Sequence, residues 1–286
     1  MNLLKSVFIS AFLTWLALVS LYSFTQLARG TEPLLSWLGL ALTALAPLVF
    51  FIKAFLFKSP RTPRHPVEYS ILSGLGLAVT MAMSFRYGDA AGMIHAWAGA
   101  TLLLWLAYLR WYSVFRGRDA RLLEAGSPLP EFRLETLDGH IVSSESFKAK
   151  PHLLLFYRGN WCPFCTAQVE ELAAEYQRLE ALGLSVVLIS SQPIKKNQAL
   201  AARFDVPMTF LRDRDNLAAK QLGILHKWGT PMGMQLLGYD SDTVMPTVIL
   251  TDAQGQVIYS DQTDNYRVRP EPAAFEALLR AKSLDS

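Results

Sequence analysis

The chain has 286 residues, which is enough for two domains of ordinary size. Apolar residues make up 51% of it and seven residues are tryptophan, a composition typical of a protein with a membrane region. A net charge of only +3 argues against a nucleic-acid partner, and two cysteines are too few for a disulfide-rich secreted scaffold.

The N-terminal third contains four uncharged apolar runs, each near the length that crosses a bilayer. They cover residues 7–24, 34–52, 69–85 and 90–109. The first run lacks a small-residue cleavage site and further apolar runs follow it, so we expect a membrane helix rather than a signal peptide. The sequence therefore predicts an α-helical membrane bundle of four transmembrane helices over residues 1–115.

Lysine and arginine are unevenly distributed between the loops that join these runs. One side of the membrane would hold Lys5, Lys53, Lys58, Arg61, Arg64, Arg110, Arg116, Arg118 and Arg121. The other side would hold only Arg29 and Arg86. The positive-inside rule then predicts a multi-pass protein of an inner or plasma membrane, with both termini in the cytoplasm. If the third run does not span, the assignment reverses for everything after it.

A basic linker over residues 116–126 precedes Ser127-Pro-Leu-Pro130, which cannot continue a helix. In the segment that follows, predicted strands alternate with predicted helices. We expect strands at 132–134, 141–142, 153–157, 184–190, 208–211, 243–250 and 256–260, and helices at 163–182, 195–204, 216–222 and 272–282. This order predicts an α/β domain over residues 127–286, with its sheet covered on both faces.

Both cysteines lie in one motif, Trp161-Cys162-Pro163-Phe164-Cys165, between a predicted strand and a predicted helix. Thiols one helical turn apart are close enough to form a disulfide. Unpaired N–H groups at a helix N-terminus favour a thiolate, and such settings lower a cysteine pKa from ~8.5 to roughly 3.5–7.5. We therefore predict a redox dithiol, with Cys162 as the nucleophile and Cys165 as its partner.

Metal and haem sites are not expected here. A structural zinc site needs about four ligands, and no second cysteine pair or nearby histidine cluster is present. Haem attachment would need histidine after the second cysteine, where the chain has Thr166. No cofactor is expected beyond the redox-active disulfide itself.

From about residue 127 to 282 the chain resembles the thioredoxin superfamily, and within it the redoxin, or AhpC/TSA, group of peroxiredoxin-like proteins. The motifs that carry the resemblance are Leu129-Pro-Glu-Phe132 with Asp138-Gly139, Phe156-Tyr-Arg-Gly-Asn-Trp-Cys-Pro-Phe-Cys165, Met245-Pro246-Thr247 and Asp264-Asn-Tyr-Arg-Val-Arg-Pro-Glu-Pro272. The resemblance implies a thioredoxin-like fold. It also implies that Pro246, followed by Thr247, is a cis-proline beside the disulfide.

Two features depart from the family pattern. A typical peroxiredoxin has threonine or serine three residues before its peroxidatic cysteine and proline seven before it. Counted from Cys162, these positions are Gly159 and Leu155. Thioredoxins place a buried carboxylate in the strand before the motif, and residues 153–157 contain none.

Several other residues are candidates for supporting roles. Trp161 could shield the thiolate or face a partner, and Arg158 could stabilise the thiolate or polarise a peroxide oxygen. Arg267 and Arg269 are candidates of the same kind, with ordinary packing or solvation as the alternative. His95 is ionisable and lies within a predicted span, but it has no evident partner and defines no haem or quinone site.

The favoured hypothesis is a membrane-anchored, peroxiredoxin-like thiol oxidoreductase. The Cys162 thiolate would attack a hydroperoxide, Cys165 would condense with the resulting sulfenic acid, and an external thiol would reduce the disulfide. Proximity to membrane lipid suggests lipid hydroperoxides as substrates. Two alternatives stay open: a thioredoxin-type oxidoreductase acting on protein disulfides, and a non-enzymatic membrane redox sensor or scaffold.

Overall fold

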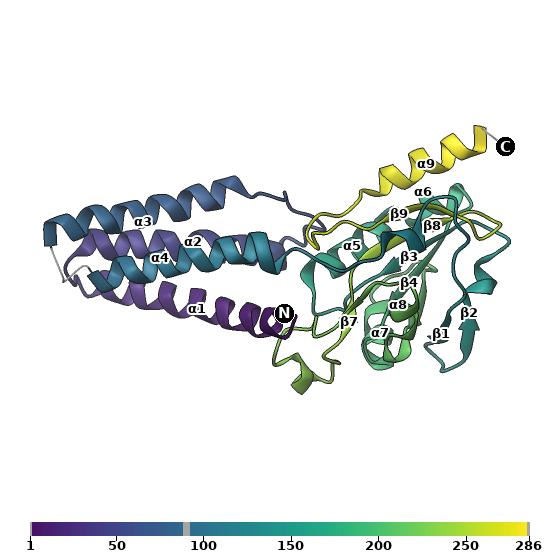
Figure 1. Ribbon diagram of the computed structural model, residues 1–286, viewed down its shortest axis with the longest axis horizontal. Helices are drawn as coiled ribbons and strands as arrows, with labels where there is room; N and C mark the ends of the chain where they lie inside the picture. The colour runs from purple at the N-terminus through teal and green to yellow at the C-terminus, as the bar shows by residue number, and fades with distance from the viewer. Residues whose placement is uncertain (1, 88–91, 285–286) are drawn as a thin grey trace. The chain divides into compact units, whose positions relative to one another are not determined.

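The computed structural model describes residues 2–87 and 92–284. The chain divides into two compact units, whose secondary structure is drawn in Figure 1. One unit consists of Val7–Phe57 and Thr62–Val114. The other contains Met1–Ser6, Lys58–Arg61 and Phe115–Ser286.

The first unit is helical. Its elements are α1 (Asn2–Ala28, which begins in the other unit), α2 (Leu34–Leu56), α3 (Val67–Tyr87), α4 (Gly92–Ala107) and a π-helical turn (Tyr108–Tyr112). Among the described residues, four helical stretches are long and apolar enough to cross a membrane: Asn2–Ala28, Leu34–Leu56, Val67–Phe85 and Gly92–Tyr112. Each predicted apolar run is thus helical, although positions 90 and 91 of the fourth run lie outside the described residues.

Helices α2 and α3 pack against each other through small and polar residues. A methyl group added to Gly39 would lie 2.7 Å from the carbonyl oxygen of Gly76, so the two backbones approach closely. Ser73 Oγ donates a hydrogen bond to the carbonyl of Thr43 at 3.0 Å. His95 also has a partner, since its Nδ1 lies 2.7 Å from Ser84 Oγ.

The second unit is built on a seven-stranded sheet. Its strands are β1 (Arg133–Thr136), β2 (Ile141–Ser143), β3 (His152–Phe156), β4 (Ser185–Ser190), β5 (Thr209–Arg212), β8 (Thr247–Thr251) and β9 (Val257–Asp261), in the spatial order β2-β1-β5-β4-β3-β8-β9. Strands β3, β4 and β5 are parallel, and β8 runs antiparallel to β3. A separate antiparallel pair, β6 (Leu225–His226) and β7 (Thr243–Val244), includes a strand that the sequence did not predict.

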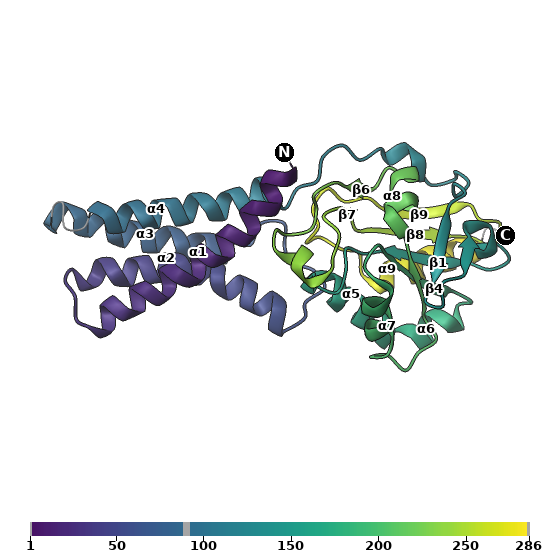
Figure 2. The ribbon, with the colours of Figure 1, turned by 90° about the horizontal axis from the view of Figure 1, so that it is seen from below.

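Five α-helices accompany the sheet. They are α5 (Pro163–Ala174), α6 (Tyr176–Ala181), α7 (Ile194–Ala201), α8 (Leu217–Gln221) and α9 (Pro272–Leu284). Figure 2 shows α8 on one side of the strands and α5, α6 and α7 on the other, so the sheet is covered on both faces as predicted. The single helix expected over residues 163–182 is two helices that meet at Glu175, whose φ and ψ are −93° and 5°.

Strand β3 is the centre of the core. Leu153, Leu154, Leu155 and Phe156 are all completely buried, between a parallel neighbour and an antiparallel one. Burying side chains of this size contributes about 1.5–3 kcal/mol each. The segment that follows β3 therefore starts from a rigid point in the sheet.

Candidate active site

The two cysteines lie in the first turn of α5. Cys162 precedes the helix as its N-cap, and Pro163 takes the first helical position, where its missing N–H costs nothing. The carbonyl of Cys162 accepts hydrogen bonds from the N–H groups of Cys165 at 3.0 Å and Thr166 at 3.1 Å. Both cysteines are free, and they are only 2% and 0% exposed.

A buried arginine from the C-terminal segment contacts Cys165. Arg269 Nη2 donates to Cys165 Sγ at 3.7 Å, and Arg269 Nη1 donates to Gln168 Oε1 at 2.9 Å. Arg269 Nε donates to the carbonyl of Tyr266 at 2.6 Å. The guanidinium is therefore held from three sides with one edge facing the sulfur.

The surroundings shift the pKa values of the two thiols in opposite directions. Burial alone would raise the pKa of Cys165, but the hydrogen bond from Cys162 and the charges of Arg269 and Arg158 lower this pKa to about 5. That same hydrogen bond, together with burial, raises the pKa of Cys162 well above its ordinary value. The lowered pKa thus falls on Cys165, whose sulfur accepts from Cys162 and Arg269, and not on Cys162 as the helix N-terminus led us to expect.

Arg158 lies within the site rather than in solvent. It is 4% exposed, and its guanidinium carbon lies 4.7 Å from the ring centroid of Trp161 and 5.4 Å from that of Tyr266. Arg158 Nη2 also donates to the carbonyl of Gly229. The structure thus places Trp161 beside Arg158 as a half-buried aromatic face for this cation.

Gly159 shapes the approach to the motif. Its φ is +142°, and a Cβ at this position would lie 2.8 Å from Trp161 Nε1 and 3.2 Å from Gln192 Oε1. A threonine or serine here would therefore displace the indole. The glycine that departs from the family pattern is required by the local packing.

A buried polar network fixes the loop between β3 and α5. Gln192 accepts from the N–H of Asn160 at 2.9 Å and donates to Asn197 Oδ1 at 2.6 Å and to the Tyr157 hydroxyl at 3.1 Å. The Tyr157 hydroxyl donates to Asn197 Oδ1 at 2.6 Å, and burial raises the pKa of Tyr157. These amides were not among the predicted site residues, although a polar run directly after a buried strand is a usable signal.

The segment Met245-Pro246-Thr247 enters β8. The prediction of a cis-proline is wrong: among the described residues the cis bond is Glu32–Pro33, and the Met245–Pro246 bond is trans. The guanidinium of Arg118 contacts both residues that follow this peptide bond, Pro246 and Thr247. Arg118 donates to the carbonyl of Pro246 at 3.2 Å and to Thr247 Oγ1 at 2.8 Å. The Thr247 hydroxyl in turn donates to the carbonyl of Met245 at 2.8 Å.

Arg118 lies in the basic linker by sequence, but its half-buried guanidinium bonds to residues of the redox unit. Burial lowers the pKa of Arg118 to about 10, with Asp261 opposing this change and Arg269 adding to it. Arg267 is completely buried. Arg158 and Arg269 place two positive charges beside the buried thiols, which favours a bound anion or a thiolate.

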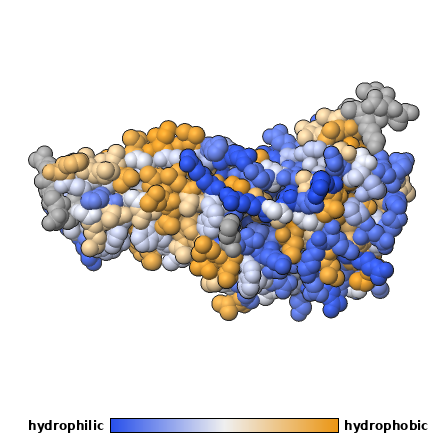
Figure 3. Space-filling view, in the orientation of Figure 1, coloured by the Kyte–Doolittle hydropathy of each residue, from blue (hydrophilic) through white to orange (hydrophobic). Residues whose placement is uncertain are grey.

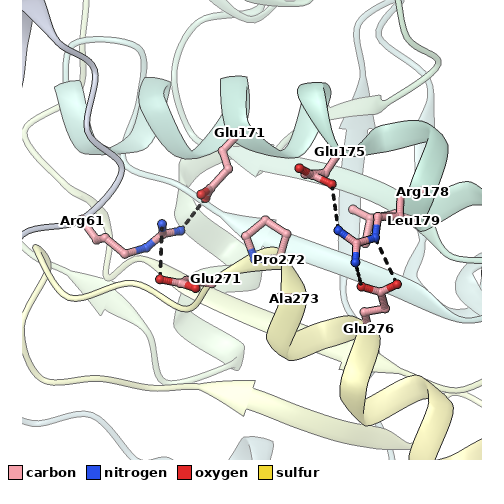
Figure 4. A pocket seen from close by; sticks show the side chains of 9 residues that line it. All are labelled: Arg61, Glu171, Glu175, Arg178, Leu179, Glu271, Pro272, Ala273 and Glu276. Carbon is pink, nitrogen blue, oxygen red and sulfur yellow. Dashed lines mark hydrogen bonds and ion pairs between the residues drawn. The ribbon is translucent and has the colours of Figure 1, made fainter.

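A surface pocket of the same unit holds further charges, drawn in Figure 4. Arg61 pairs with Glu171 at 2.5 Å, and Arg178 pairs with Glu276 at 2.7 Å and with Glu175 at 3.6 Å. These residues join the segment Lys58–Arg61, α5, α6 and α9. Because opposite charges are paired along the pocket and none of its lining residues is in the thiol site, we assign it a structural role.

Comparison with known proteins identifies the family of this unit. Residues 125–260 match the AhpC/TSA family. A peroxiredoxin Q of Populus jackii, described as chloroplastic, is 30% identical over 160 residues, which cover 56% of this chain and 68% of the relative. The chain belongs to the AhpC/TSA family. It is a peroxiredoxin-like, thiol-dependent oxidoreductase.

Two further matches extend the comparison of this AhpC/TSA protein. A putative peroxiredoxin bcp of Coxiella burnetii is 30% identical over 103 residues, covering 36% of this chain and 68% of the relative. Among solved structures, peroxidoxin BcpB from Mycobacterium tuberculosis gives a TM-score of 0.46 at 22% identity, over 56% of this chain and 97% of that chain. The family match begins at residue 125, after the four apolar helices.

Proposed function

We propose that this chain is a membrane-anchored thiol peroxidase that reduces hydroperoxides through a Cys162–Cys165 dithiol/disulfide cycle. The contact between Arg269 and Cys165 is the observation that carries the proposal. It supplies a thiolate at neutral pH and, beside it, N–H donors for a departing oxygen.

The cycle assigns the first step to Cys165. Its thiolate attacks one peroxide oxygen, so that an S–O bond forms while the O–O bond breaks, and the departing oxygen takes a proton to leave as alcohol or water. The Cys162 thiol then condenses with the sulfenic acid, forming the disulfide and releasing water. An external dithiol donor returns two electrons and two protons, and is itself oxidised to a disulfide.

This order explains one departure from the family pattern. Counted from Cys165, the residue three positions earlier is Cys162. The Cys162 thiol therefore stands where the family resemblance places a threonine or serine hydroxyl, and like that hydroxyl it donates a hydrogen bond to the reacting sulfur. One residue then serves both as hydrogen-bond donor and as the resolving thiol.

The four apolar helices support membrane anchoring, and the excess of basic residues on one side supports a cytoplasmic location for the redox unit.

The test uses the full chain in detergent or nanodiscs, reduced and mixed rapidly with hydrogen peroxide or an organic hydroperoxide. We expect wild-type oxidation far faster than that of a free thiol, followed by disulfide formation. Cys162→Ser should keep the fast step and accumulate a sulfenic acid that a dimedone probe traps, whereas Cys165→Ser should lose the fast step. Wild-type oxidation at the rate of a free thiol would contradict the peroxidase assignment.

A further inference from the structure

Residues 228–239, which we call the apolar loop, join β6 to β7 and expose several large apolar side chains. The exposed fractions are 47% for Trp228, 50% for Met232, 91% for Leu236 and 59% for Leu237. The 3₁₀ turn Met234–Leu237 buries none of its residues. Figure 3 shows hydrophobic side chains gathered over this loop at the lower edge of the molecule. Grouped apolar exposure of this kind marks an interaction surface.

The apolar loop is bonded to the first turns of α1. Ser6 Oγ donates to the carbonyl of Thr230 at 2.5 Å, and the N–H of Met232 donates to the carbonyl of Ser6 at 3.1 Å. Helix α1 has 27 residues, so at ~1.5 Å per residue it exceeds a hydrocarbon core of ~30 Å, and its first turns would lie at the headgroups. Ser6 and the apolar loop belong to the same unit, so the loop lies beside the start of this helix.

The other side of the loop reaches the thiol site. Arg158, whose charge helps lower the Cys165 pKa, donates to the carbonyl of Gly229. The Tyr239 hydroxyl donates to the side chain of Asn160, two residues before Cys162. Arg158, Trp161, Thr230 and Tyr239 line one small pocket together. Both ends of the apolar loop therefore meet the residues that frame the cysteine motif.

We propose that the apolar loop inserts into the interfacial layer of a lipid bilayer and that peroxidised phospholipid acyl chains are the substrate class. The proposal rests on the peroxidase function proposed above, and it names its substrate. No charged residue occurs between Lys227 and Asp240, and exposed Trp228 adjoins exposed Lys227, a pattern typical of interfacial segments. The absence of charge and the tryptophan–lysine pair favour lipid over a protein partner.

A lipid hydroperoxide would be reduced by the same two-electron reaction. The lipid hydroperoxide group would meet the site at the Arg158–Trp161 pocket, take two electrons from the dithiol and leave as a lipid alcohol and water. The two thiols become the disulfide, and the thiol donor restores them.

The first experiment compares substrates in nanodiscs that contain the full chain. In a Leu236→Asn/Leu237→Asn variant, kcat/KM for a phospholipid hydroperoxide should fall roughly tenfold or more, whereas turnover of hydrogen peroxide should not change. Ile141→Asn/Leu217→Asn changes two equally apolar side chains that are 60% and 54% exposed elsewhere, and should leave both activities intact. Equal activity of the loop variant and the wild type on the lipid substrate would overturn the proposal.

The second experiment measures depth and does not need activity. A spin label is placed by Leu236→Cys in a Cys162→Ser/Cys165→Ser chain, with Ile141→Cys as the exposed reference. We expect the label at 236 to be relaxed by oxygen and shielded from a water-soluble nickel complex. Full access of nickel, or shielding from both reagents as at a protein–protein contact, would overturn the proposal. If lipid insertion is found but the wild type reduces no hydroperoxide, the substrate assignment and the peroxidase function fail together, and the membrane contact alone stands.

Discussion

Removal of the Arg269 charge should raise the pKa of Cys165. At 3.7 Å, and with an effective dielectric constant of about 20, two unit charges attract by about 4–5 kcal/mol. At about 1.4 kcal/mol per pH unit, Arg269→Met should move this pKa from about 5 to about 8. The thiolate fraction at about pH 7 then falls from nearly all to about one tenth, and the peroxidation rate falls about tenfold.

The assay follows thiolate absorbance and alkylation rate against pH in a Cys162→Ser background, which leaves Cys165 as the only thiol and keeps a hydroxyl donor at 162. Arg269→Lys is the matched control, because it keeps the charge but loses the planar fork, and should lie between the wild type and Arg269→Met. Above about pH 9 the three proteins should react at similar rates. An unchanged pKa in Arg269→Met would refute the assignment of the thiolate to this contact.

Three further predictions concern the surroundings of the site. Gly159→Ala should cost about 1–3 kcal/mol and displace Trp161, since the new Cβ would lie 2.8 Å from the indole nitrogen; thermal unfolding and near-ultraviolet circular dichroism measure both effects, and unchanged values would contradict the packing argument. Asp213 accepts the N–H groups of Ala218 and Ala219, so Asp213→Ala should cost about 2 kcal/mol by urea denaturation. Burial raises the pKa of Asp213 to about 6, so wild-type stability should fall relative to Asp213→Asn as pH rises from about 4 to about 6. Arg118→Ala should lower the free energy of unfolding by about 1–2 kcal/mol, because Thr247 Oγ1 and the Pro246 carbonyl lose their donor, with Arg121→Ala, a change at an exposed arginine, as the neutral control.

Local patterns predict the strands that are buried continuously along their length. The apolar run before the motif is strand β3, and the Val- and Ile-rich run after it is strand β4, because each is buried along nearly its whole length. Nothing local predicts β6, a two-residue strand that depends on pairing of Leu225 with Val244. The break at Glu175 also lacks a glycine or proline to mark it.

The errors at the site arise from distant contacts. Arg118 was counted with the basic residues that orient a membrane protein, but its guanidinium binds residues 128 and 129 positions further along the chain. The expected cis form of Pro246 came from resemblance alone, and the peptide bond here is trans. A basic residue near a predicted membrane helix can either orient that helix or bind groups within a folded unit, and only the tertiary structure shows which.

The roles of the two cysteines also depend on distant contacts that the local sequence does not reveal. Cys162 and Cys165 both lie in the first turn of α5, so the helix dipole favours a thiolate on either sulfur and cannot select one. The guanidinium that contacts Cys165 belongs to Arg269, which lies 104 residues beyond Cys165 in the sequence. Spacing therefore identifies the candidate redox pair, whereas the sulfur that we propose to attack is the one contacted by the cation that the rest of the fold brings to that turn. In another chain with the same motif, an arginine placed against the first cysteine would reverse the roles without any change in the motif itself.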